Sequence, residues 1–137
     1  GEKDALAVRT ANREMRVVAR LLLAACDAGT VWSLENPHTS RLWKCSEWKR
    51  VLRRDSAFAE TMYCQYGKLW RKATWFLHWC PIAVALQDYL PICHKIDGKC
   101  CATLKPHLRI SGVTSDGRFL TKIAEPYPTA LCKKLAN

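Results

Sequence analysis

The sequence of 137 residues has no long hydrophobic run, little glycine and few acidic side chains. Its longest apolar stretches are far shorter than the ~20 residues that a membrane-spanning helix needs. The segment from Leu21 to Cys26 is short and lies inside a helical pattern, so we do not expect a signal peptide. Internal repeats and low-complexity segments are lacking too. What is present is an apolar fraction of 49% with six tryptophans, which predicts one packed domain over residues 1–137.

Positive charge is in excess, because 22 lysine and arginine residues stand against 12 acidic ones and give a net charge of +10. Charge of this size bears on partners rather than on fold. The partners that it favours are polyanions: nucleic acid, an anionic membrane surface or an acidic protein. A basic surface that is merely solvated is the alternative interpretation.

The eight cysteines allow two interpretations. Disulfide frameworks belong mostly to secreted chains that are too small to build a core, whereas this chain has enough apolar residues for one. We therefore expect reduced thiols, some of them on a metal, in an intracellular reducing compartment (nucleus, cytoplasm or organelle). A secreted form with disulfides is the alternative.

The order of the expected elements predicts an α/β domain. The expected helices cover residues 4–28, 40–54, 81–90 and 128–135, and the expected strands cover 30–34, 57–66 and 73–79. Apolar residues recur at helical spacing in the first helix, which Asp27-Ala28-Gly29 stops, and Thr39 or Ser40 caps the second. The strands predict a partial Rossmann-like sheet with flanking helices and an antiparallel hairpin at one edge. Residues 1–90 would form this α/β part, and 91–137 a loop-rich Cys/His part with a short final helix.

Two segments at strand ends carry side chains that suit nucleic acid. Glu35-Asn36-Pro37 holds an acceptor and an amide in fixed positions, which can meet the edge of a base. The tip of the expected hairpin interleaves an aromatic ring with cations, so rings can stack on bases while cations meet phosphates. The predicted nucleic-acid-binding residues are Arg41, Lys44, Lys68, Trp70, Arg71 and Lys72. The structural alternatives are a plain turn at Asn36-Pro37 and a charged hairpin that only protects a sheet edge.

A cluster of cysteine and histidine in the last third predicts a zinc site. Two Cys/His groups lie in a loop with Gly98 and Pro106, and zinc prefers four thiolate or imidazole ligands in a tetrahedron. The predicted ligands are Cys93, His94, Cys101 and His107, with Cys132 or Cys64 as spatial alternates. Buried free thiols or a disulfide are the other interpretations.

The order of these motifs resembles the C-terminal half of DNA cytosine methyltransferase-like proteins of phages and mobile genetic elements. The shared features are a strand ending in Glu-Asn-Pro, a Ser-x-Leu-Trp helix start, a Cys-x-Tyr-Gly strand, a basic hairpin, a Cys/His cluster and Tyr-Pro-x-x-Leu-Cys. In cytosine methyltransferases a Glu-Asn-Val motif contacts the flipped cytosine. The resemblance therefore implies that Glu35 and Asn36 are the catalytic residues, with Pro37 in place of Val.

The rest of a methyltransferase site is not expected in this sequence. A glycine-rich turn for S-adenosylmethionine and a Pro-Cys nucleophile would precede Glu35, and the sequence has neither there. We therefore expect a non-catalytic methyltransferase-like domain that binds nucleic acid or scaffolds a larger assembly. The alternatives are a split or truncated S-adenosylmethionine-dependent DNA methyltransferase completed by another chain, and a structural subunit of a large complex such as a ribonucleoprotein.

Overall fold

A computed structural model describes residues 1–82 and 85–136, and the chain divides into two compact units. The first unit contains Gly1–Ala59 and Phe76–Leu86, and the second contains Glu60–Trp75 and Gln87–Asn137. The expected division of the chain after residue 90 stays a prediction. The segment from 60 to 75 is grouped with the C-terminal part of the chain.

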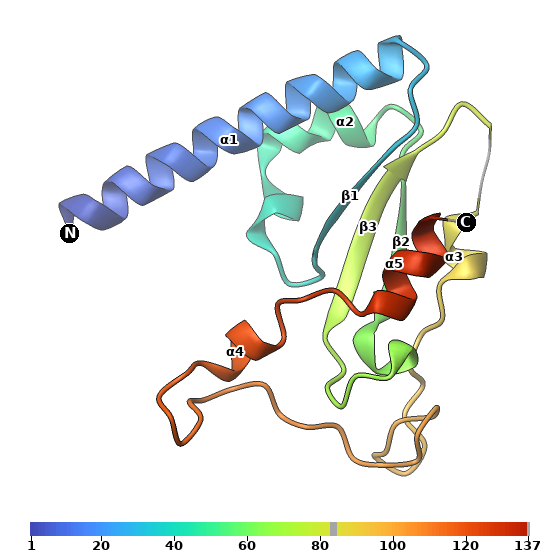
Figure 1. Ribbon diagram of the computed structural model, residues 1–137. Helices are drawn as coiled ribbons and strands as arrows, with labels where there is room; N and C mark the ends of the chain where they lie inside the picture. Colours follow the sequence, from blue (N-terminus) through green and yellow to red (C-terminus); the bar gives the residue numbers. More distant parts are fainter. Residues whose placement is uncertain (83–84, 137) are drawn as a thin grey trace. The chain divides into compact units, whose positions relative to one another are not determined.

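The described residues form one long helix, several short helices and one three-stranded sheet, joined by loops (Figure 1). The longer elements are α1 (Glu2–Asp27), β1 (Trp32–Pro37), β2 (Ala57–Met62), β3 (Ala73–Trp79) and α5 (Thr129–Ala136). The single-turn elements are η1 (Arg41–Lys44), η2 (Ser46–Trp48), α2 (Lys49–Leu52), η3 (Tyr63–Tyr66), α3 (Leu86–Tyr89) and α4 (Leu120–Ile123). None of the described helices combines the length and the apolar character needed to cross a bilayer.

The sheet has the strand order β1-β3-β2 and is antiparallel. The mixture of helix and sheet and the antiparallel pairing of β2 with β3 are confirmed. A Rossmann-like sheet, whose strands are mostly parallel, is not confirmed by these three strands. The central strand β3 has the bounds expected from sequence, because its β-branched and aromatic residues suit a strand that pairs on both sides.

The first helix ends as its sequence predicts. Gly29 has a φ of +69°, the left-handed conformation that only glycine adopts without cost. Its amide donates to the carbonyl of Cys26 at 3.0 Å, and the amide of Thr30 donates to the carbonyl of Ala25 at 2.8 Å. These two bonds form a Schellman motif, which satisfies carbonyls at the end of the helix.

The core of the first unit lies between the second half of α1 and the elements that follow it. Its buried residues are Met15, Ala19, Cys26, Trp32, Trp48, Val51 and Leu77. The indole Nε1 of Trp32 donates to the Cys26 sulfur at 3.3 Å, so this thiol is part of the packing. All residues from 1 to 14 are exposed, because the core begins only at Met15.

The prediction of one continuous helix over residues 40–54 is wrong. Ser40 does cap it, since its hydroxyl accepts from the Leu42 amide at 3.3 Å, but the helix breaks at Cys45. Cys45 is extended, with φ −71° and ψ 139°, and separates η1 from η2 and α2. Cysteine and serine have low helix propensity, and the Trp43 indole is tied to the Pro37 carbonyl at 3.0 Å. Local anchoring therefore overrides the helical spacing of the apolar residues.

The strand expected over residues 57–66 is shorter than predicted. It ends at Met62, and Tyr63–Tyr66 form the 3₁₀ helix η3, which closes at Gly67 with a φ of +83°. The helix expected over 81–90 is present only as α3, and residues 83–84 of that range lie outside the described residues. The final helix is confirmed as α5, one residue later than expected.

Candidate metal centre

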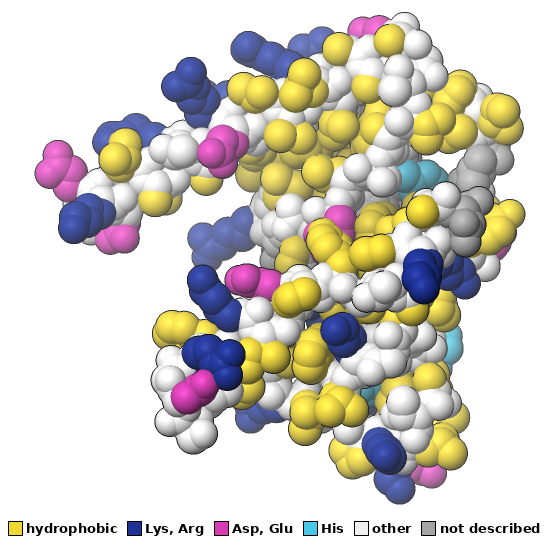
Figure 2. Space-filling view, in the orientation of Figure 1, with side chains coloured by type: hydrophobic (Ala, Val, Ile, Leu, Met, Phe, Trp, Pro, Cys, Tyr) yellow, Lys and Arg dark blue, Asp and Glu magenta, His cyan; other side chains and the backbone are white. Residues whose placement is uncertain are grey.

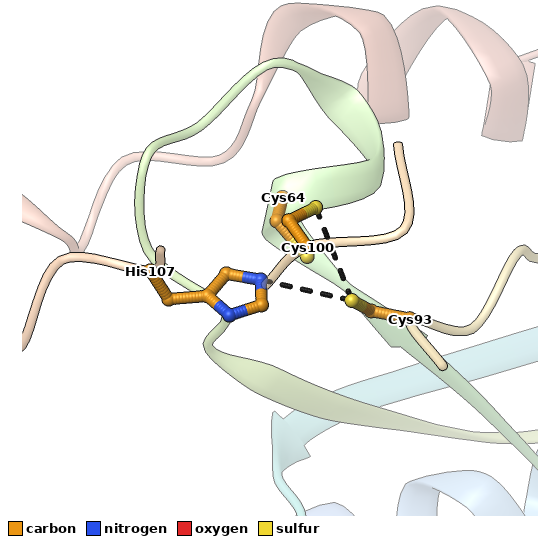
Figure 3. Close-up of side chains that lie close together, drawn as sticks. All are labelled: Cys64, Cys93, Cys100 and His107. Atoms are coloured by element: carbon orange, nitrogen blue, oxygen red, sulfur yellow. Dashed lines mark hydrogen bonds between the residues drawn. The ribbon is translucent and has the colours of Figure 1, made fainter. Parts of the chain in front are cut away.

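Three thiols and one imidazole meet in the second unit. The ligand atoms of Cys64, Cys93, Cys100 and His107 all lie within 4.8 Å of one another. Figure 3 shows the four side chains pointing toward one point, with the Cys93 sulfur 3.9 Å from the Cys100 sulfur and 3.6 Å from the His107 Nε2. The three cysteines are buried and the histidine is half-buried. This group could hold a metal ion.

A tight turn joins the two central ligands. Ile96 and Lys99 exchange backbone hydrogen bonds of 3.0 and 2.9 Å across Asp97-Gly98. Asp97 has a φ of +48° and Gly98 a φ of +75°, so both central residues are left-handed, as a type I′ turn requires. Asp-Gly is a favoured pair for this turn. The turn reverses the chain and brings Cys100 back beside Cys93.

Neighbouring parts of the second unit position the segments that carry Cys64, Cys93 and His107. Cys64 lies in η3, directly after β2, where the chain leaves the sheet. The Cys93 amide donates to the thioether sulfur of Met62 at 3.3 Å, which ties the Cys93 segment to the end of β2. His107 is held by the bond from the Leu108 amide to the Leu69 carbonyl at 2.9 Å. The segments of Cys93 and His107 are therefore each tied to a different part of the second unit.

The thiols differ in acidity. Burial raises the pKa of Cys64 to about 12 and also raises the pKa of Cys93. Burial acts in the same direction on Cys100. There the backbone amides of Thr103 and Ala102, with the Thr103 hydroxyl and His107, donate hydrogen bonds that outweigh it and lower the pKa to about 6. At neutral pH Cys100 is therefore a thiolate, and a metal ion must displace the protons of Cys64 and Cys93.

The predicted ligand set and the observed group share two members. Cys93 and His107 are in the group, while Cys64 and Cys100 take the places expected for His94 and Cys101. His94 is exposed, because it follows Cys93 directly in an extended segment where neighbouring side chains point apart. Cys101 stays close, with its sulfur 3.9 Å from that of Cys93. Sequence spacing alone did not single out Cys64, because it lies on a distant segment.

One amide links the thiols around this group. The Gln65 Nε2 donates to the Cys64 sulfur at 3.7 Å and to the Cys101 sulfur at 3.5 Å. Groups that hydrogen-bond to metal ligands orient them and tune their affinity. Gln65 is therefore placed to position Cys64.

The hairpin residues expected to bind nucleic acid are half-buried within the second unit. The Arg71 guanidinium contacts the Met62 sulfur at 3.1 Å and donates to the Cys93 carbonyl at 3.5 Å. Lys72 donates to the Ala124 carbonyl at 3.2 Å and stacks over the Tyr63 ring at 4.6 Å. Lys68 covers the ring of Trp70 at 5.6 Å. These contacts pack the hairpin within the second unit, beside the group formed by Cys64, Cys93, Cys100 and His107.

The remaining predicted residues lie in the first unit. Glu35 and Asn36 are half-buried in the last half of β1, so the Glu-Asn-Pro motif does end a strand. The neighbouring strand β3 runs antiparallel to β1, so the carboxyl ends of these two strands lie at opposite ends of the sheet. Arg41 and Lys44 are exposed at the two ends of η1.

Comparison with known proteins adds no relative. No protein family, no curated protein and no solved structure matches this chain.

Proposed function

We propose that this chain is a zinc-stabilised, non-catalytic binding module of the methyltransferase-like kind, which binds nucleic acid or holds together a larger assembly. The observation that carries the proposal is the convergence of Cys64, Cys93, Cys100 and His107 within 4.8 Å. Three thiolates and one imidazole suit zinc, whereas magnesium and calcium prefer oxygen ligands.

The ligand set favours a structural zinc over a catalytic one. Catalytic zinc keeps three protein ligands and leaves a fourth position for water or substrate, but this group supplies four protein ligands. Three thiolates around Zn²⁺ leave one negative charge in excess. The Arg71 guanidinium, which donates to the Cys93 carbonyl, is placed to offset that charge. With its ligands deprotonated, zinc would fix the loop-rich segment after α3.

The binding role is supported by charge. A net charge of +10 favours phosphate contacts, and exposed Arg41 and Lys44 lie beside the Glu35-Asn36-Pro37 motif in sequence. The methyltransferase-like resemblance points to nucleic acid as the polyanion. If phosphate contacts dominate, affinity for duplex DNA falls with salt at a log–log slope of about −0.9 per contact.

Metal content and duplex binding test the proposal together. Protein purified without chelator should contain one zinc per chain, and Cys93→Ser should lose it. Cys132→Ser is the matched control, because Cys132 is exposed and lies outside the metal group. A full-length preparation with intact free thiols and no metal would contradict the zinc part. A flat salt response in a filter-binding titration would contradict the nucleic-acid part.

A further inference from the structure

The helix α1 carries a row of arginines on one side. Arg9, Arg13, Arg16 and Arg20 follow one another at steps of four, three and four residues. At about 100° per residue these steps keep the four side chains within a sector of ~60°. The rise of 1.5 Å per residue spreads them over ~16 Å of the helix. Figure 2 shows Lys and Arg side chains in a row along the upper edge of α1, with hydrophobic side chains on its lower side.

The core does not use this side of the helix. The buried residues of α1 are Met15, Ala19 and Cys26, which lie about a third of a turn away from the arginine row. All four arginines are exposed. Over residues 9–20 this sector contains no acidic residue, since Glu14 lies on another side of the helix. Glu2 and Asp27, which share the sector, lie about two turns beyond its ends.

Little of the positive charge on this row is neutralised within the chain. Arg16 contacts Glu47 at 3.4 Å, but within residues 1–82 and 85–136 no carboxylate pairs with Arg9, Arg13 or Arg20. Like charges three and four residues apart destabilise a helix. The first half of α1 also lacks the packing that usually stabilises a helix in a protein, because residues 1–14 are exposed. An external anion would relieve the repulsion and support this half.

The row ends at a hollow with further positive charge. Arg16, Arg20 and Arg50 line it together with Ala19 and Glu47, and its volume is about 200 Å³. That is several times the ~30 Å³ that a water molecule occupies, so a hydrated phosphate group fits. With Arg16 facing Glu47, Arg20 and Arg50 remain to receive an anion. Guanidinium groups bind phosphate oxygens through two parallel hydrogen bonds, which makes arginine suited to this ligand.

We propose that the arginine row of α1, with Arg50 at its end, binds the phosphate backbone of a nucleic-acid duplex. This inference rests on the proposed nucleic-acid function and moves its main contact surface from the hairpin to α1. A duplex presents about one charge per 1.7 Å of its axis, so a straight row of ~16 Å meets several phosphates at once. A bilayer surface is the weaker match, because an interfacial helix inserts a continuous apolar face. On α1 the exposed apolar residues Leu6, Val17 and Leu21 share their side of the helix with Lys3, Thr10 and Glu14.

The test compares two variants of equal net charge on the full chain. In one, Arg9, Arg13 and Arg20 are replaced by glutamine; in the control, exposed Lys122, Lys133 and Lys134 are replaced by glutamine. Glutamine forms helices well, so circular dichroism and zinc content should match those of the original protein. The probe is a duplex DNA of about 20 base pairs, titrated by filter binding between 50 and 200 mM salt, a range over which phosphate contacts are resolved.

The expected result is a change of slope in the α1 variant alone. Loss of three contacts makes the log–log slope of the α1 variant about 2.7 less steep. Between 50 and 200 mM salt the original protein therefore loses about 40-fold more affinity than the α1 variant does. A steep slope kept in the α1 variant, or lost equally in the control, overturns the inference while the proposed function stands. No duplex binding by the original protein overturns both the inference and the nucleic-acid part of the proposed function. Displacement of the duplex by vesicles containing phosphatidylserine, with vesicle binding lost in the α1 variant, overturns it in favour of a membrane surface.

Discussion

Removing the metal should loosen one defined segment of the chain, residues 96–108. The segment contributes two of the four ligands, Cys100 and His107, and begins three residues after Cys93. The backbone hydrogen bonds of this segment join residues close in sequence, except the bond from the Leu108 amide to the Leu69 carbonyl. The donors are the amides of Ile96, Lys99, Cys100, Leu104 and Leu108. With the proposed zinc bound, its amides would therefore be protected from exchange mainly by the four ligands that tie the segment down.

The size of the effect follows from mass action. Free zinc at about 1000 times its dissociation constant stabilises the metal-bound state by about 4 kcal/mol. Every 1.4 kcal/mol changes an opening equilibrium tenfold, so chelation should speed hydrogen exchange of the 96–108 amides by about 1000-fold. Exchange in the second half of α1, around Met15 and Ala19, should not change, because its core contains no ligand.

Hydrogen–deuterium exchange with mass spectrometry measures this directly, with and without a chelator. Cys93→Ser should exchange fast in this segment even with zinc present, whereas Cys132→Ser should behave like the original protein. Equal exchange of 96–108 before and after verified removal of zinc would refute a structural role for the metal. Faster exchange throughout α1 as well would refute its confinement to this segment.

Two further changes probe the first unit. Burial lowers the pKa of His78, so the native state resists a proton that the unfolded chain binds below about pH 6.5. The free energy of unfolding should therefore fall as pH drops below that value, and urea titrations in saturating zinc should show a shallower fall for His78→Phe; parallel pH profiles would contradict this. Leu77 is fully buried on the central strand, and Leu77→Ala should cost about 2–5 kcal/mol in the same titration. A loss below about 1 kcal/mol would show that the Leu77 site is not tightly packed.

The sequence alone determined the features that depend on neighbouring residues. The stop at Gly29 follows from glycine's access to positive φ, and the Ser40 cap follows from a hydroxyl that reaches a nearby amide. The bounds of β3 follow from a run of β-branched and aromatic residues. A Cys/His group that could hold a metal ion was expected from residue type, since thiol and imidazole side chains in a short loop suit a soft metal ion.

Only the tertiary structure decided which side chains meet. Cys64 joins the metal group because η3 turns the chain away from the sheet beside the Cys93 segment, and no local pattern encodes that contact. The choice of Cys100 over Cys101 depends on the Asp97-Gly98 turn, which sets the direction of each side chain. Likewise, Arg71 packs beside Cys93 while the α1 arginines stay exposed, because burial depends on contacts far apart in sequence. Periodicity fixes which residues share a face, but packing fixes what that face touches.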